Sequence, residues 1–303
     1  MRSLRPLRTC APTVAFLVFA GVGCASSGGA NGGARSAMHY SDEAQQAYED
    51  AMVLYRDEAW PEALEAMRRV RQEYSSSRWG WLAELRIADI DFKQERFTEA
   101  LSGFRAWIRY HASQSEATYA HFMIARCHVA QMPDDWFLTP PAHERDLSSA
   151  HDAEGALTRF LRDHGQTEHA AEARRILGQV RRILAQHELY VADFYASRER
   201  WAAAISRLTG LLDGYEGSGV EPGALLKLGE ILLRTGRQPE ARGAFRELID
   251  THPQANEVAA ARRYLAVVGE GPVTPVDRGP ARSVPPPTRP GSRESTPARR
   301  TAQ

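Results

Sequence analysis

The stretch ALSGFRAWIRYH, residues 100–111, contains the pattern that decides the fold. Ala100 is followed four positions later by Phe104, seven positions later by Trp107 and eleven positions later by His111. The same register, with other large apolar residues and a final Tyr or His, starts again at Ala63, Ala153, Ala204 and Ala241. A small residue lets two helices approach closely, while the large residues line one helix face.

A second small residue marks the partner helix of most repeats. It lies twelve positions before the repeat alanine, at Ala51, Ala88, Ala192 and Gly229. Two such helices form an antiparallel pair that buries its core only by stacking on neighbours, which is the tetratricopeptide pattern. The sequence therefore predicts an all-α solenoid of about five helix pairs over residues 41–268, without a sheet. Arrays of this kind are binding surfaces far more often than catalysts.

Two of the intervals between repeat alanines are longer than the others. The spacings are 37, 53, 51 and 37 residues. We expect the first long interval to hold a loop over residues 132–147, and the second a helix of about thirty residues over 168–198. Within the loop, exposed Trp136 and Phe137 are candidate anchors for a partner, although they could equally fold back between repeats.

The N-terminal segment is predicted to be a secretory signal followed by a lipid-anchored cysteine. Residues 1–23 have three Arg followed by an apolar stretch that is too short to span a bilayer, as in a secretory signal. The end of this segment resembles a bacterial lipoprotein box, which implies diacylglycerol and an N-acyl chain on Cys24 and delivery to the outer membrane. Residues 24–40 are then a flexible Gly/Ser tether. The alternative is an ordinary secreted protein cleaved near Ala25.

The C-terminus has a different composition from the repeats. Residues 269–303 hold eight of the 17 Pro, six Arg and few large apolar residues. Such a segment cannot bury enough surface to order itself, so we expect a disordered tail. A tail without a defined partner is favoured over one that contacts anionic lipid or peptidoglycan.

Composition and motifs argue against other classes of protein. The formal net charge is zero, so nothing in the total suggests nucleic acid. No phosphate-binding loop, nucleophile elbow or zinc-protease helix is present in the sequence. We therefore expect neither an enzyme nor a metal or other cofactor. Cys127 lies inside an apolar helical run and is expected to be a buried core residue.

The repeat register also predicts where a partner would bind. The first helix of each pair lines the concave groove of a tetratricopeptide array. Projecting the register places these residues there: Tyr48, Tyr55, Arg86, Asp89, Lys93, Asp193, Lys227, Glu230 and Arg234. Their mixture of aromatic groups and both charges suits an extended peptide. Joint substitution of Tyr48 and Asp89 is then expected to weaken binding without lowering the melting temperature.

Two stretches carry a more specific resemblance. Trp136-Phe137 is followed by Glu144-Arg145-Asp146, and the later helix contains Val191-Ala192-Asp193-Phe194-Tyr195. With the two long intervals, they resemble the BamD family of the outer-membrane β-barrel assembly machinery. The resemblance covers about residues 40–255, with Cys24 as the lipidated residue.

The resemblance implies a non-enzymatic scaffold on the periplasmic face of the outer membrane. The C-terminal half would dock on the periplasmic domains of the barrel subunit BamA, alongside other barrel-assembly lipoproteins. The N-terminal half would receive unfolded outer-membrane protein segments. One alternative is a tetratricopeptide pilotin or envelope-coordination factor for a secretin or the Tol-Pal system, although even 34-residue repeats are typical of pilotins. A periplasmic enzyme with a helical accessory region is a weaker alternative, since no catalytic constellation supports it.

Overall fold

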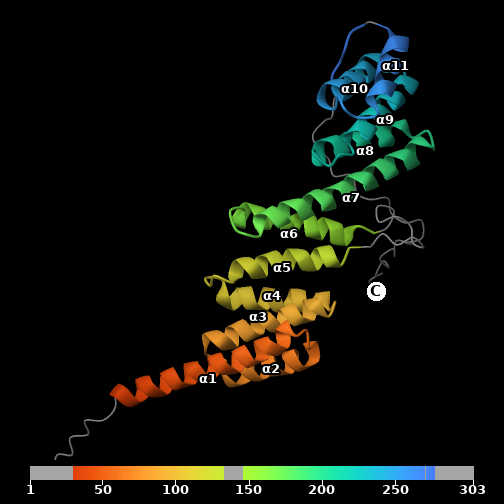
Figure 1. Cartoon of the computed structure of the whole chain (residues 1–303). Coiled ribbons are helices and arrows are strands. Elements are labelled where there is room, and N and C mark those ends of the chain that lie inside the picture. The colour runs from red at the N-terminus through yellow and green to blue at the C-terminus, as the bar shows by residue number, and fades with distance from the viewer. Residues whose placement is uncertain (1–29, 133–145, 270, 277–303) are drawn as a thin grey trace, which may run out of the picture.

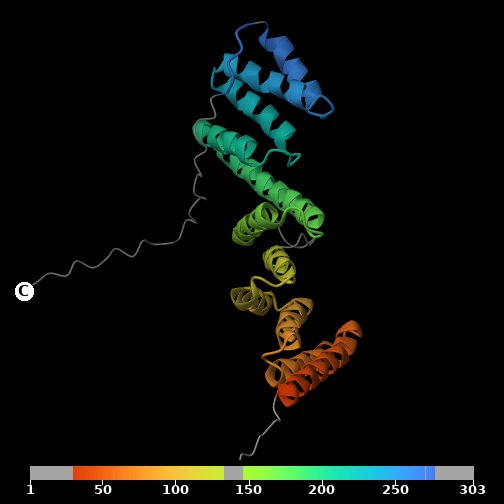
Figure 2. The ribbon, with the colours of Figure 1, turned by 90° about the vertical axis from the view of Figure 1, so that its left-hand side faces the viewer.

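The computed structural model describes residues 30–132, 146–269 and 271–276, and within these ranges every regular element is a helix (Figure 1). The helices are α1 (Ala30–Arg56), α2 (Trp60–Glu73), α3 (Arg78–Lys93), α4 (Phe97–His111), α5 (Ala117–Ala130), α6 (Ser148–His164), α7 (Ala170–Ala196), α8 (Trp201–Gly214), α9 (Glu221–Arg234), α10 (Gln238–Thr251) and α11 (Val258–Val268). Consecutive helices pack side by side and stack into an elongated array (Figures 1 and 2). The predicted all-α solenoid is confirmed.

The repeat residues occupy the positions that the register predicts. The five repeat alanines are fully buried, at Ala63, Ala100, Ala153, Ala204 and Ala241. Phe104 and Phe245, at the +4 position, are also fully buried. A Cβ added to Gly229 would lie 2.3 Å from the Phe245 ring, so only glycine allows this close packing of α9 on α10. A small residue and a large residue therefore meet across the α9–α10 hairpin.

The turn into the second helix of a pair has the same backbone shape in four repeats. The residue five positions before the repeat alanine has a positive φ, at Glu58, Glu95, Glu199 and Gly236. The following amide then donates to the carbonyl five residues earlier, as Arg96 N does to Asp91 O at 2.8 Å. A left-handed residue with this return hydrogen bond is the Schellman end of a helix. It reverses the chain within a few residues and fixes the hairpin.

Helix α1 begins earlier than the sequence suggests. The predicted flexible tether reached residue 40, whereas α1 begins at Ala30. Two contacts explain why the last residues of that segment are ordered. His39 Nδ1 lies 3.1 Å from Glu43 one turn later, and the Tyr40 ring packs 5.3 Å from the Tyr74 ring, centroid to centroid. Tertiary contact with the end of α2 thus favours helix where composition favoured coil.

The boundary of the C-terminal tail is also a correction. Residues 271–276, here called the terminal strap, run across α10 instead of starting a disordered segment at residue 269. Arg242 donates to the carbonyls of Val268, Gly269 and Pro272, and the amide of Thr274 donates to Pro239 O at 3.0 Å. These hydrogen bonds, together with burial of Val276, supply contacts that composition alone does not reveal.

Several predicted features lie outside the described residues. They are the signal segment 1–23, the lipidated Cys24, most of the 132–147 loop with Trp136 and Phe137, and residues 277–303 of the tail. No helix within the described ranges is both long enough and apolar enough to cross a bilayer. Cys127 is buried as expected, and burial raises the pKa of its thiol to about 12, so it is a poor nucleophile.

Candidate functional site

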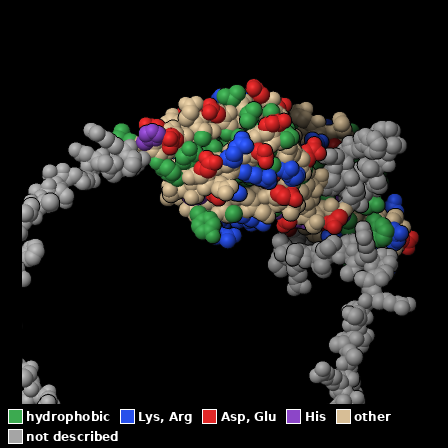
Figure 3. Space-filling view, turned by 90° about the horizontal axis from the view of Figure 1, so that it is seen from below, with side chains coloured by type: hydrophobic (Ala, Val, Ile, Leu, Met, Phe, Trp, Pro, Cys, Tyr) green, Lys and Arg blue, Asp and Glu red, His purple; other side chains and the backbone are tan. Residues whose placement is uncertain are grey.

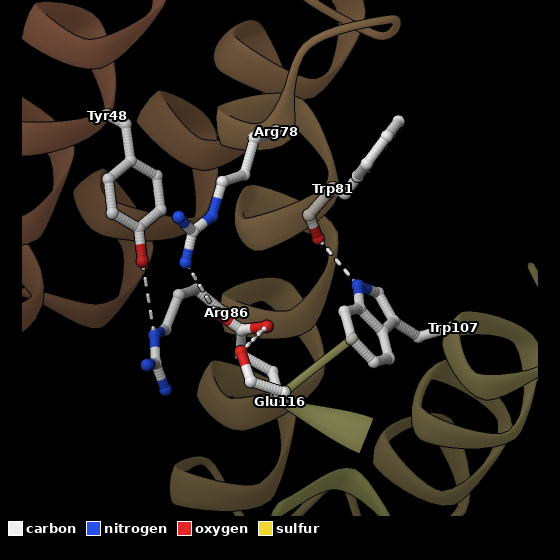
Figure 4. Close-up of polar contacts among 7 residues, drawn as sticks. Tyr48, Arg78, Trp81, Arg86, Trp107 and Glu116 are labelled. Atoms are coloured by element: carbon white, nitrogen blue, oxygen red, sulfur yellow. Dashed lines mark hydrogen bonds and ion pairs between the residues drawn. The ribbon is translucent and has the colours of Figure 1, made fainter. Parts of the chain in front are cut away.

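Side chains from α1, α3 and α5 converge on Arg86 in the N-terminal half. The Arg86 Nε donates to the Tyr48 hydroxyl at 3.4 Å, and Arg78 lies above it with its guanidinium 3.0 Å from Glu116 (Figure 4). The Arg86 guanidinium also lies 5.9 Å from the centre of the Tyr55 ring and 5.7 Å from that of Tyr119. Arg86 is thus held by a cation–π cage and hydrogen bonds together.

Asp89 is the buried counter-ion of this network. Only 1% of its surface is exposed. Arg86 donates to one carboxylate oxygen and the Tyr119 hydroxyl donates to the other at 2.7 Å. Burial raises the pKa of the Asp89 carboxyl, while Arg86 and Tyr119 oppose that effect. Burial also raises the pKa of Tyr119, and the Asp89 charge adds to the rise. Three helices are therefore joined by one ionic cluster.

This arrangement corrects the sequence-based view of Tyr48 and Asp89 as free groove residues. Tyr48 is buried, with its ring 5.3 Å from that of Trp79. The carboxylate of Asp89 accepts a hydrogen bond from Tyr119 on α5. The sequence pattern of a single repeat does not show how α5 packs against α3. Joint substitution of Tyr48 and Asp89 is therefore expected to lower the melting temperature, because it leaves Arg86 without its partners.

A cavity of about 550 Å³ opens beside this network, between α3, the start of α5 and the turn before α7. Its wall contains Arg86 and Tyr119 from the network. The rest of the wall consists of acidic and hydroxyl side chains together with one histidine and one leucine: Ser115, Glu116, Thr118, Thr167, Glu168, His169 and Leu85. Hydrogen-bond donors and acceptors are thus available along one hollow, as recognition of an extended backbone requires.

The N-terminal end of the solenoid has both charge signs interspersed (Figure 3).

The other two predicted residues of this half lie at the edge of the network. Tyr55 is half-buried against Trp60, with a ring distance of 5.5 Å. Burial, followed by the charge of Asp89, raises the pKa of the Tyr55 hydroxyl to about 12. Lys93 is exposed at the end of α3. Arg86, Tyr55 and Lys93 therefore remain candidates for contact with a partner.

The predicted residues of the C-terminal half form a separate group on α7 and α9. Lys227 Nζ lies 2.9 Å from Asp193 Oδ1. Glu230 accepts a hydrogen bond from the Tyr264 hydroxyl at 3.0 Å, and the Arg234 guanidinium lies 5.9 Å from the centre of the Trp201 ring. All four predicted side chains thus bridge neighbouring helices at the surface.

Sequence reasoning missed several residues of both groups. Tyr190 and Phe194 are exposed aromatics one turn apart on α7, and their spacing of four would have identified them. Arg198 covers Phe194 with its guanidinium 3.6 Å from the ring centre. Tyr119 and Glu116 had no comparable signal, since their role depends on how α5 packs against α3.

Comparison with known proteins adds to this geometry. The family described as "YfiO: Outer membrane lipoprotein" matches residues 40–248. The chain belongs to this family. The resemblance noted from the sequence is thereby confirmed, and the match includes both the Arg86 network and the α7–α9 group.

Individual relatives are distant. An outer membrane protein assembly factor BamD of Caulobacter vibrioides is 25% identical over 183 residues, which are 60% of this chain and 57% of that protein. A BamD of Xylella fastidiosa is 24% identical over 68% of this chain and 70% of its own length. Among solved structures, a thermophilic TPR protein of Thermus thermophilus is 18% identical, with a TM-score of 0.34, over 74% of this chain and 98% of that one.

Proposed function

We propose that the chain is an outer-membrane lipoprotein scaffold of the β-barrel assembly machinery. It binds BamA periplasmic domains and nascent outer-membrane protein segments, and promotes their folding and insertion. The observation that carries this proposal is a polar, aromatic hollow on a helical-repeat scaffold in a chain of this family. Relatives with the name of outer membrane protein assembly factor support it.

The anchor in this proposal is the lipid on Cys24, and it keeps the solenoid on the periplasmic face of the outer membrane. Several acyl chains, each contributing about 0.8 kcal/mol per buried CH₂, make such attachment effectively permanent. No other cofactor is needed, since the work of the scaffold is binding.

The two groups of surface residues have different partners in this proposal. The hollow beside Arg86 receives an extended segment of an unfolded protein, because it offers donors, acceptors and aromatic edges in one place. The α7–α9 face, with exposed Tyr190 and Phe194, docks on BamA, since aromatic side chains near a polar rim are typical of a protein interface.

Affinity purification tests the proposed complex. The tagged full chain is isolated from outer membranes in mild detergent, and co-purifying proteins are identified. BamA in stoichiometric amount, with accessory barrel-assembly lipoproteins, is the expected result. A secretin or Tol-Pal components in its place would assign the chain to the pilotin or envelope-coordination class.

Peptide binding tests the hollow separately. A fluorescent peptide with the C-terminal sequence of an outer-membrane barrel protein is titrated with the full chain. Thr118→Arg, which fills the hollow, is expected to weaken binding about tenfold or more. Thr158→Arg on exposed α6 is the matched control and is expected to bind normally. Equal binding by both variants would remove the hollow from the proposal.

A further inference from the structure

The terminal strap is an extended segment that lies on a helix. After α11 ends, residues 271–276 turn back along α10 at the end of the array (Figures 1 and 2). They form neither a helix nor a turn. Their sequence contains Pro272-Val273-Thr274-Pro275, in which two prolines are three positions apart. A polyproline helix has three residues per turn, so this spacing places both rings on one side of such a segment.

Arg242 on α10 holds the strap by its main chain. Only 7% of this arginine is exposed. Its Nη1 donates to Pro272 O at 3.4 Å, while its Nε and Nη2 donate to Gly269 O and Val268 O, each at 3.2 Å. A Cβ added to Gly271 would lie 2.8 Å from the guanidinium carbon, so the chain passes closely over it. The guanidinium therefore joins the end of α11 to the strap.

Gly243 lets the strap lie directly on the α10 backbone. A Cβ at this position would lie 2.3 Å from Thr274 O and 3.3 Å from the carbonyl carbon of the same residue. Any larger residue would therefore lift the strap from the helix. Four positions earlier, Pro239 O accepts a hydrogen bond from the Thr274 amide at 3.0 Å. Glycine is unfavourable in a helix interior, and here its missing side chain makes room for an extended chain.

Val276 is the side chain of the strap that enters the core. Only 9% of it is exposed, and it belongs to the apolar cluster of α7–α11. Val273, in contrast, is 37% exposed. The helix thus contacts main-chain groups of Pro272 and Thr274, and the cluster takes one apolar side chain. Main-chain hydrogen bonds combined with a pocket for a particular side chain are a common way of binding an extended segment.

We propose that Pro239, Arg242 and Gly243 form a binding site for an extended Pro-x-x-Pro segment of a partner protein, and that the terminal strap fills this site in cis until it is displaced. The partner segment carries a branched apolar residue directly after its second proline, at the position of Val276. The site is separate from the hollow beside Arg86 and from the α7–α9 face. The inference therefore goes beyond the proposed function and does not depend on it.

The strap competes with any partner segment for this site. It follows the end of α11 at Val268 by only two residues, and a segment on so short a connection acts at an effective concentration of about millimolar or higher. Molecules with an empty site are therefore the minor population. The apparent affinity for a partner segment is lowered by the fraction of molecules that are open. Release of the strap is thus expected to raise that affinity about tenfold or more.

Nuclear magnetic resonance on the full chain tests the site. A strap-open variant combines Thr274→Pro, which removes the amide donor to Pro239 O, with Val276→Asp, which places a charge at a buried position. The probe is an acetylated and amidated peptide with the sequence GPVTPV of residues 271–276. The Gly243 amide signal of the strap-open variant is expected to shift as peptide is added. The parent chain is expected to bind the peptide about tenfold more weakly, or less.

Matched glycine substitutions separate binding from stability. Added to the strap-open variant, Gly243→Ala is expected to abolish peptide binding, because its Cβ occupies the place of the bound carbonyl. Alanine favours helix over glycine, so the melting temperature is not expected to fall. Gly210→Ala on α8 is the control. Its Cβ would meet no neighbouring atom within 4 Å, and peptide binding is expected to stay unchanged.

Several outcomes would overturn the proposal. One is the absence of any shift in the strap-open variant at a peptide concentration of about 10 mM. Equal binding by the parent chain would show that the strap does not fill the site, and binding that survives Gly243→Ala would place the peptide elsewhere. Strap signals that keep their docked positions in the strap-open variant would also contradict it, because the two substituted contacts would then not hold the strap.

Discussion

The two ends of the solenoid repeat one sequence register but hold their helices together differently. Helices α7–α11 share one continuous apolar core, in which α8, α9 and α10 contribute leucines along with Phe245. Helices α1–α5 have two smaller apolar clusters, one over α1–α3 and the other over α3–α5. Between them lies the Arg86–Asp89–Tyr119 network, in which Asp89 is buried. The same helical hairpin can therefore be stabilised by apolar burial or by an ionic cluster.

The difference has consequences for stability and for recognition. An apolar core loses free energy in proportion to the atoms removed from it, with an added cost for the cavity. Removing one partner of a buried ion pair has a different cost, because the remaining charge is left in the interior without compensation. The N-terminal half thus combines an open hollow with a network that is expected to tolerate few substitutions.

The largest expected effect on stability comes from removing the buried aromatic ring of Phe245. Phe245 is fully buried, stacks on Tyr264 at 5.1 Å and packs against Gly229. Phe245→Ala is expected to lower the free energy of unfolding of the C-terminal region by about 3–5 kcal/mol. Hydrogen exchange measured helix by helix is suitable, because repeat arrays can unfold in parts. Loss of protection is expected over α7–α11.

Phe104→Ala is the matched change in the other half. Phe104 is also fully buried, but its apolar cluster covers only α3–α5. Loss of protection is therefore expected to stay within α3–α5 and the adjoining helices. If both variants lost protection over the entire array, the distinction between one shared core and separate clusters would be wrong.

The second effect concerns the ionic cluster. Asp89→Ala leaves the Arg86 guanidinium without its carboxylate and the Tyr119 hydroxyl without its acceptor. We expect a loss of about 3 kcal/mol in the free energy of unfolding, measured by urea denaturation. Tyr48→Phe removes a single 3.4 Å hydrogen bond and serves as the mild control, with a loss of at most about 1 kcal/mol. A normal melting temperature for Asp89→Ala would contradict the buried-network interpretation.

The third effect concerns the terminal strap. A chain ended after Gly269 loses the Pro272 carbonyl that Arg242 contacts, the Thr274–Pro239 hydrogen bond and the burial of Val276. We expect a loss of about 1–3 kcal/mol, detected as faster hydrogen exchange in α10 and α11. A chain ended after Val276 keeps all of these contacts and is the control. Equal exchange in both truncated chains would show that the strap contributes nothing to stability.

The smallest effect belongs to a surface pair. Lys227 and Asp193 are 2.9 Å apart, with more than a third of each side chain exposed. Exposed pairs contribute little, so Lys227→Ala is expected to change the free energy of unfolding by less than about 1 kcal/mol. Affinity for BamA, measured by co-purification, is expected to fall if the α7–α9 face is the docking surface. If Lys227→Ala lowered the free energy of unfolding as much as Asp89→Ala, the distinction between an exposed ion pair in one half and a buried one in the other would be wrong.

Much of the fold was predictable because its signal is local. The spacing of Ala100, Phe104 and Trp107 describes one helix face, and any helix with that face must find an apolar partner. The long helix predicted over 168–198 is α7. The candidate site was predicted less well. Arg86, Tyr55 and Lys93 keep accessible surface, whereas Tyr48 and Asp89 are buried.

The sequence by itself determined the helices and their repeat register, since the residues that form one helix face lie within one or two turns of each other. Only the tertiary structure decided which polar side chains are free. Asp89 is occupied because Tyr119, thirty positions later, reaches it from α5. The strap lies along α10 because Arg242 donates to Pro272 O and the amide of Thr274 donates to Pro239 O. Such contacts join residues distant in sequence, so no local pattern specifies them.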